Sequence, residues 1–428
     1  MRLIRTLPST ILTAALAIPL AAQDPPSHTG MAVMNMPGMS LMNLASGTSQ
    51  NPASWTMPEV MMHFGNWTTM FMGTAFLVDT QQSVPRGGDK LYSPNWSMTS
   101  ASHRAGNKGA FEAVLMLSLE PATVTDRRYP LLFQTGETAY GIPLADAQHP
   151  HNFIMEVGLH YKRALTDDTS LEVYAAPVGD PALGPVAYPH RASAMELPEA
   201  PLSHHLQDST HIADDVVTVG LSRKLFKLEA SGFHGAEPGE NRWIVQAGAV
   251  DSWSGRLWFF PGRNWEMQVS AGRLAHPEAD QPGDQVRATA SLEYSVPMHN
   301  GSWSSSLIWG RAHNTFTSHN LNSYLAESVF PISRRNLITG RFELMDKDEL
   351  FSGQPELETQ LDRLYGSTFR IGVYTIGYTR DVPISRYLET GVGFNFTAYT
   401  LPAAIQPYYG SHPAGGNIFV RFRLRSPS

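Results

Sequence analysis

Histidines gather in one stretch of the chain, LSHHLQDSTH at residues 202–211, together with one aspartate. If this stretch winds as a helix, His204, Asp208 and His211 fall at positions i, i+4 and i+7 and share one face. Two imidazoles and a carboxylate so placed are able to bind Zn²⁺ or Cu²⁺. The competing interpretation is structural, because a long loop packed in a polar interior needs side chains that hydrogen-bond to its surroundings. We expect the structural role first and metal binding only conditionally, since spacing alone often misleads.

Two other segments add potential metal ligands. HPHN at residues 149–152 holds two histidines that point the same way if the chain is extended, and MAVMNMPGMSLM at residues 31–42 is rich in methionine. Thioether sulfur is a soft ligand that favours Cu(I), so the methionine-rich segment could bind copper. The alternative interpretation is that this segment is an arm that plugs or lines one mouth of the protein. No cofactor is firmly predicted, and copper or zinc would suit these ligands. The candidate metal ligands are His149, His151, His190, His204, His205, Asp208, His211, Met34, Met36 and Met39.

The N-terminal residues predict export. Arg2 and Arg5 precede the apolar run ILTAALAIPL, and the small residues Ala21 and Ala22 follow it, as in a secretory signal peptide spanning residues 1–22. The run is too short for a membrane-spanning helix, which needs about 20 apolar residues. Residues 23–60 are rich in Met, Pro, Ser, Asn and Gly and show no sustained period, so we expect a flexible arm.

Composition excludes two classes of protein. The chain has no cysteine, so an exported protein of this kind has no disulfide framework, and its net charge of −7 argues against nucleic acid as a partner. Charged residues make up only 16% of the chain, against about 25% in ordinary soluble domains. A protein embedded in a membrane as strands would account for that deficit.

A closed barrel is predicted from the alternation of apolar and polar residues that begins near residue 61. In RATASLEYSV (287–296) and LITGRFEL (337–344), one face of each expected strand is apolar and the other carries full charges. Segments of about ten residues suit tilted membrane strands. Short turns alternate with long polar links, and we divide residues 61–424 into sixteen strands, with 14 to 18 allowed. The expected fold is therefore an all-β, transmembrane antiparallel up-and-down β-barrel with long outer loops, short periplasmic turns and a tail at 425–428.

Residues 416–424, GNIFVRFRL, resemble the alternating aromatic final strand of bacterial outer-membrane β-barrels of the porin-like type. The chain departs from that pattern because RSPS follows where an aromatic residue normally ends the protein. Long stretches are also similar to uncharacterised outer-membrane proteins, and the methionine-rich arm weakly resembles that of copper-resistance protein B. These resemblances imply the outer membrane of a Gram-negative bacterium and lipid as a partner, and they imply no catalytic residue.

We expect a channel that passes small hydrophilic solutes or ions, since barrels of this strand number enclose an aqueous lumen. The alternative is an outer-membrane protein that binds copper or another divalent metal, or confers resistance to it. A hydrolase at the barrel rim is a third hypothesis, but we find no G-x-S-x-G, H-E-x-x-H or phosphate-loop motif, so we do not expect an enzyme. The alternation of apolar and polar residues does not indicate an oligomeric state. The side chains expected to line the lumen are Glu112, Glu156, Glu229, Glu266, Arg287, Glu293, Arg341, Glu343, Arg421 and Arg423.

Overall fold

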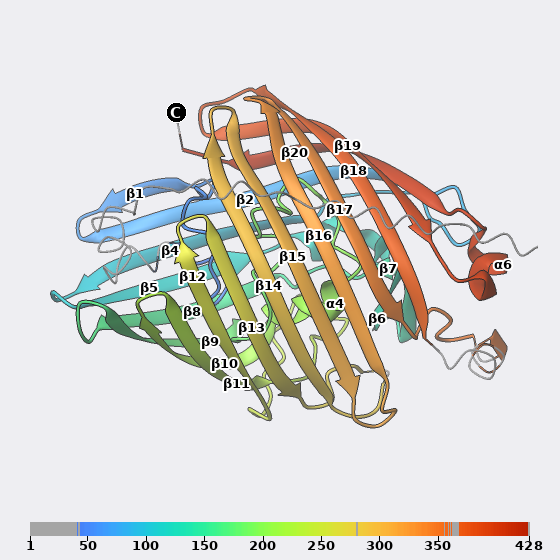
Figure 1. The fold of residues 1–428 in the computed structure, drawn as a ribbon, viewed down its shortest axis with the longest axis horizontal. Coiled ribbons are helices and arrows are strands. Elements are labelled where there is room, and N and C mark those ends of the chain that lie inside the picture. The colour runs from blue at the N-terminus through green and yellow to red at the C-terminus, as the bar shows by residue number, and fades with distance from the viewer. Residues whose placement is uncertain are drawn as a thin grey trace, which may run out of the picture.

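The computed structural model describes residues 41, 43–279, 281–354, 356–357, 359, 361 and 368–426. Among them, 18 strands form one sheet, of which β1 (Val60–Phe64) and β3 (Lys90–Tyr92) are short side pieces, so that 16 strands make the wall of a barrel (Figure 1). The wall strands are β2 (Trp67–Gln81), β4 (Asn95–Ala105), β5 (Gly109–Leu117), β8 (Ile154–Ala164), β9 (Thr169–Gly179), β10 (Ala213–Arg223), β11 (Phe226–His234), β12 (Ser252–Gly262), β13 (Trp265–Leu274), β14 (Gln285–Met298), β15 (Gly301–Asn314), β16 (Asn320–Ser333), β17 (Asn336–Lys347), β18 (Phe369–Pro383), β19 (Leu388–Thr400) and β20 (Ala414–Leu424).

The barrel is closed by its first and last long strands. β2 pairs antiparallel with β20, with Leu77 opposite Val420, and every other wall strand pairs antiparallel with its neighbours in the chain. Closure leaves no free edge, so the backbone hydrogen bonds of the wall are made within it. The prediction of sixteen wall strands between residues 61 and 424 is confirmed, and so is the antiparallel up-and-down topology.

The wall is apolar outside and polar inside. Leu307, Ile376 and Val392 are more than half exposed, at 56%, 59% and 54%, whereas the neighbouring inward positions on these strands are mostly small, polar or charged. This arrangement reverses that of a soluble protein and matches a barrel surrounded by lipid. No helix of the described residues is both long and apolar enough to cross a membrane.

Short and long connections lie at opposite ends of the barrel, as predicted. β14 and β15 are joined by two residues, 299–300, and β16 and β17 by 334–335. At the other end, residues 118–153, 180–212 and 348–368 connect β5 to β8, β9 to β10 and β17 to β18. The long link 118–153 contains α3 (Glu120–Thr123), η1 (Thr125–Arg127) and a separate hairpin of β6 (Tyr129–Ala139) and β7 (Ile142–Gln148), and η3 (Ala403–Ile405) and α6 (Gln406–Tyr409) lie in the last link.

Residues 180–212, which we call the inserted loop, fill the barrel interior. Nearly every residue of this loop is buried, and its short helix α4 (His204–Gln207) contacts β15 and β16 of the wall (Figure 1). η2 (Ser209–His211) follows α4 and leads into β10. The many prolines of this loop restrict its backbone, which lowers the entropy lost when it docks. The loop therefore folds inward into the barrel.

The N-terminal segment differs from its prediction over the part that the structure describes. Residues 44–51 were expected to belong to a flexible arm, but all of them except the half-buried Gln50 are buried inside the barrel, where Leu44 and Gln50 form an antiparallel bridge. Ser46 donates to Asp180 (2.7 Å), and Lys227 of β11 donates to the carbonyl of Thr48 (2.9 Å). A lumen as wide as that of 16 strands leaves room for a second insertion beside the loop, and its polar wall supplies partners. The predicted signal peptide and residues 23–40 and 42 of the arm lie outside the described residues.

Candidate functional site

The ten charged side chains expected in the lumen are all buried inside the barrel, with 0–6% of each residue exposed. Alternation along the strands places them there, because their chain neighbours face outward; Phe342 and Phe422, for example, are 40% and 39% exposed. Their part in solute passage stays a prediction. The residues are Glu112, Glu156, Glu229, Glu266, Arg287, Glu293, Arg341, Glu343, Arg421 and Arg423.

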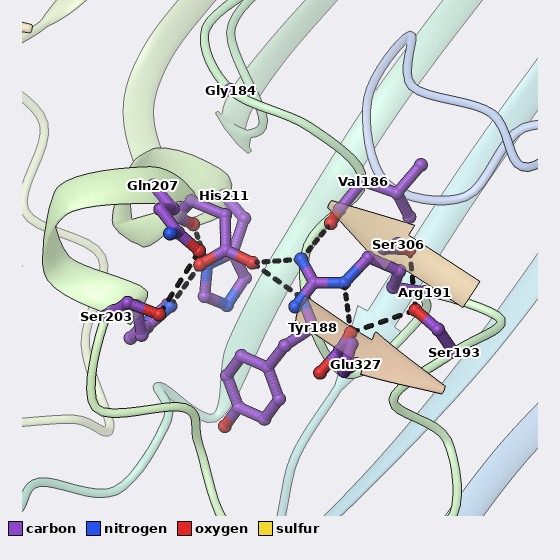
Figure 2. Close-up of polar contacts among 12 residues, drawn as sticks. Gly184, Val186, Tyr188, Arg191, Ser193, Ser203, Gln207, His211, Ser306 and Glu327 are labelled. Carbon is purple, nitrogen blue, oxygen red and sulfur yellow. Dashed lines mark hydrogen bonds and ion pairs between the residues drawn. The ribbon is translucent and has the colours of Figure 1, made fainter. Parts of the chain in front are cut away.

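Arg191 is the centre of the contacts between the inserted loop and the wall (Figure 2). Its guanidinium donates from Nε to Glu327 of β16 (2.6 Å) and from Nη1 to Asp208 of the loop itself (3.1 Å). Ser193 donates to the same oxygen of Glu327 (2.9 Å), and the backbone N–H of Tyr188 donates to Asp208 (2.8 Å). One cation therefore joins two carboxylates, one from the loop and one from the wall.

A second contact lies on the last strand. Glu196 of the inserted loop forms ion pairs with Arg421 and with Arg423, whose Nη1 lies 2.8 Å from the Glu196 carboxylate. Arg421 is also paired with Asp381 of β18 (2.6 Å) and with Glu389 of β19. Three wall strands are thus connected to the loop through one acidic side chain.

A third contact joins the start of α4 to β17. The carboxylate of Glu343 accepts hydrogen bonds from the backbone N–H of Leu202 (3.1 Å) and Ser203 (2.7 Å) and from the Ser203 hydroxyl (2.6 Å). On the same strand, Arg341 donates to the carbonyl of Glu199 (3.1 Å) and pairs with Glu327 (2.9 Å). The wall charges on β16, β17 and β20 therefore hold the inserted loop in place.

The charges beneath the loop form networks of their own. Glu229 pairs with Lys227 (2.8 Å) and Arg256 (2.9 Å), and Arg256 donates to the carbonyl of Gly184 (3.0 Å). Glu266 and Glu293 are directly opposed on β13 and β14, and no described residue hydrogen-bonds to either carboxylate.

The remaining predicted lumen residues contact inserted segments or neighbouring charges. Glu156 accepts from Tyr174 (2.7 Å) and from the N–H of Gly47, and Arg287 donates to Ser209 (2.6 Å) of the inserted loop. Glu112 lies on β5, where its strand partner on β8 is His160. The lumen charges therefore include both signs in close proximity.

The histidine stretch forms one cluster with the HPHN run. α4 ends after one turn because Asp208 adopts φ −143°, so no continuous helix runs from His204 to His211. The predicted neighbours still meet, since His204 Nδ1 lies 2.6 Å from Asp208 Oδ1 and the rings of His204 and His211 are 5.2 Å apart. His151 lies 5.4 Å from His211, and His149 lies 5.5 Å from His205, between ring centroids.

Burial sets the charge of this cluster. Desolvation lowers the pKa of His149 to about 3 and moves the pKa values of His205 and His211 well below their usual range. Burial alone would raise the pKa of Asp208, but the adjacent His204 imidazole and the Arg191 guanidinium lower it to about 2. At neutral pH the three shifted imidazoles are uncharged and Asp208 is ionised.

Metals bind the neutral form of imidazole, so the protonation state of this cluster meets one requirement of a metal site. The cavity between His149, His151, His204, His205 and His211 measures about 20 Å³, and the Nε2 atoms of His205 and His211 have no hydrogen-bond partner. Within the described residues, however, no three His, Asp or Glu side chains are arranged to hold one ion.

His190, another predicted ligand, is not part of this cluster. His190 packs edge-on against Trp96 of β4, at 4.2 Å between ring centroids. Met34, Met36 and Met39 lie outside the described residues. Metal binding by any of these residues stays a prediction.

The charged residues of the interior that sequence reasoning missed include Glu327, Arg256, Arg191 and Glu196. The first two sit in alternating runs, LAESVF and SGRLWFF, and the period-two rule could have found them. The last two belong to the inserted loop, where no periodicity marks which side chains face the wall.

Comparison with known proteins adds the following. No family model and no curated protein matches this sequence. Among solved structures, an anion-selective porin from Comamonas acidovorans is similar with a TM-score of 0.50 at 10% identity, over 83% of this chain and 99% of that one. OmpF of Salmonella typhi, solved in complex with daunomycin, gives a TM-score of 0.50 at 8% identity, over 85% of this chain and 100% of that one.

The chain has the fold of a porin-like outer-membrane β-barrel. In this porin-like barrel the space between loop and wall is small. A cavity beside Trp96 and Tyr188 and another between Glu199 and Arg341 each measure about 30 Å³, which is room for one or two water molecules. By contrast, a vestibule of about 410 Å³ opens at the end with the long loops, beside Arg86, Lys90 and Arg128.

Proposed function

We propose that this protein is an outer-membrane channel that passes small hydrophilic solutes or ions. The observation that carries the proposal is the inverted wall, apolar and exposed outside but charged and buried inside, on a closed ring of 16 strands. A barrel of this size encloses an aqueous path when nothing fills it. We place it in the outer membrane of a Gram-negative bacterium, with lipid around the apolar face, and we propose no enzymatic activity.

The inserted loop controls the path in this proposal. Three cavities between loop and wall, of about 30, 30 and 50 Å³, are too small for a hydrated solute, so in this proposal passage requires the loop to shift from the wall. Acidic and basic wall residues both contact the loop, as with Glu327 and Arg421. Once the loop moves, charges of both signs line the path, and selectivity for one sign of ion is expected to be weak.

Liposome swelling tests the proposal. Purified full-length protein in liposomes should admit a small sugar or amino acid at a rate that rises with protein density and falls with solute size. A chemically denatured sample of the same protein is the control. Swelling no faster than in protein-free liposomes, for neutral, anionic and cationic solutes alike, would contradict the channel.

A second candidate function is binding of Cu²⁺ or Zn²⁺ at the histidine cluster. It is supported by the five imidazoles around one small cavity and by the unpartnered Nε2 atoms of His205 and His211. Calorimetric titration of the full-length protein tests it against the double variant His204→Ala, His211→Ala. Stoichiometric micromolar binding that the double variant loses would support the site, and no heat in either protein would leave the cluster a structural role only.

A further inference from the structure

Methionines face one another across three neighbouring strands of the wall. Met72 of β2 is the direct partner of Met98 of β4, and Met98 is the direct partner of Met116 of β5. All three are buried, with 1–3% of each residue exposed, so they point into the barrel rather than toward lipid. We call Met72, Met98 and Met116 the methionine row.

The row is part of one packed cluster. Met155, at the start of β8, belongs to it with 1% exposed, and Met57 packs against it from the N-terminal segment. Val178, near the end of β9, and Ile212, the last residue of the inserted loop, complete the contact. The thioethers therefore lie between the wall and the base of the inserted loop.

Geometry allows these sulfur atoms to converge. Adjacent strands lie about 4.8 Å apart, and directly opposed side chains on one face have Cβ atoms about 4.5–5.5 Å apart. Methionine has three rotatable side-chain bonds, so its sulfur adjusts by several ångströms without backbone movement. Leucine or isoleucine would fill the same hydrophobic cluster equally well. Packing volume alone therefore does not explain why methionine occupies three directly paired positions.

A carboxylate lies beside the row. Glu156 of β8 is the strand partner of Met116, and its carboxylate accepts from Tyr174 and from Gly47. A monovalent cation held here by neutral sulfur ligands would favour the ionised form of this buried carboxyl group, and the two charges would then balance. Thioethers are soft ligands and select soft, monovalent ions over Zn²⁺, Mg²⁺ or Ca²⁺.

We propose that Met72, Met98 and Met116, with Met155 beside them, form a binding site for a soft monovalent cation, Cu(I) or Ag(I), on the inner wall. The ligands of this site differ from those of the histidine cluster and from Met34, Met36 and Met39 of the arm, and the site does not depend on the channel function. Its ligands are sulfur alone, whereas the histidine cluster offers nitrogen and oxygen.

Titration of the folded full-length protein with Ag(I), which has no competing redox chemistry, tests the site. The triple variant Met72→Leu, Met98→Leu, Met116→Leu keeps the packing volume and should lose one equivalent of tight binding. The single variant Met98→Leu removes the central ligand, guards against misfolding of the triple variant, and should weaken that equivalent at least tenfold. Ag(I) should raise the Tm of the wild type but not that of the triple variant, while heat modifiability on gels reports that each variant is folded.

Two matched variants separate the row from other sulfur. Met345→Leu alters a methionine that is equally buried but lies in a different cluster, and it should bind as the wild type does. Met34→Leu, Met36→Leu, Met39→Leu removes arm ligands and should keep the Ag(I)-dependent rise in Tm. X-ray absorption of the Cu(I)-loaded arm variant should show sulfur neighbours only. Equal stoichiometry and equal affinity in the wild type and in a folded triple variant would overturn the proposal, and the row would then be hydrophobic packing alone.

Discussion

Arg191 of the inserted loop and Glu327 of β16 form an ion pair of 2.6 Å in which neither side chain has any exposed surface. The pair connects residues 136 positions apart in the chain, and its guanidinium also reaches Asp208. Breaking a buried pair by removing one partner costs about 3–5 kcal/mol, because the other charge is left without compensation. The position of the loop in the barrel therefore depends strongly on one arginine.

Replacing that arginine should loosen the loop. Arg191→Met removes the guanidinium that Asp208 and Glu327 share and leaves them with His204 and Arg341 respectively, so we expect docking of the loop to weaken by up to about 3–5 kcal/mol while the barrel stays folded. Hydrogen exchange of the loop amides measures the effect. Arg127→Met is the control, because its pair with Glu240 is partly exposed and such pairs contribute only about 0–1 kcal/mol. Unchanged exchange in Arg191→Met would show that this contact does not hold the loop.

Trypsin added to intact cells should distinguish loops that project outward from the inserted loop. Arg127 and Arg128 are exposed in the link between β5 and β8, so cleavage is expected there, whereas Arg191 is fully buried and should be spared. Mass spectrometry of the fragments reads out both positions in one sample. Cleavage after Arg191 at a rate similar to that after Arg127 would mean that the loop lies outside the barrel in the cell.

Charge on the outer face should oppose membrane insertion. Leu307 is 56% exposed near the middle of β15, and Leu307→Arg should lower the free energy of unfolding in lipid vesicles by about 2–4 kcal/mol. Phe316 is also exposed but lies in the turn after β15, so Phe316→Arg should cost only about 0–1 kcal/mol at the interface. Equal effects at the two positions would place Leu307 outside the hydrocarbon region.

Acid should release the inserted loop. The folded pKa of His149 is about 3 and those of His205 and His211 also lie well below 6.5, because burial disfavours the charged form. The undocked loop therefore binds more protons, so these groups stabilise docking above pH 6.5 and lose that contribution as the pH falls toward 3. Asp180 acts in the opposite direction, since burial raises its pKa to about 8 and it takes up a proton on docking.

The pH dependence is measured by hydrogen exchange of the loop between pH 7 and pH 4. The variant His149→Gln, His205→Gln, His211→Gln lacks the three shifted imidazoles of the cluster and keeps His190, whose pKa burial also lowers to about 3, so its docking should change less over this range than that of the wild type. If the wild type and the variant lose protection in parallel, the histidines do not control the acid response.

The wall could be predicted from sequence, whereas the interior could not. Alternation such as Arg341–Phe342–Glu343 assigns each residue to a face without knowledge of its neighbours, and that local rule recovered all sixteen strands. The contacts of Glu196 with Arg421 and of Thr48 with Lys227 join residues more than 170 positions apart, and no local period encodes them. Composition showed that the inserted loop is rich in proline and histidine. The polar composition of residues 44–51 suggested a free arm, but the lumen of the barrel is wide enough to hold this segment, and most of its residues are buried there.

The most direct test of the channel and its loop is single-channel conductance in planar bilayers. The wild-type protein should give discrete steps that are small or brief, because the inserted loop closes most of the lumen, and Arg191→Met should give larger or longer steps at the same protein density. The control Arg127→Met should match the wild type. No discrete conductance in either the wild type or Arg191→Met, with both proteins shown to be folded and inserted, would contradict the account.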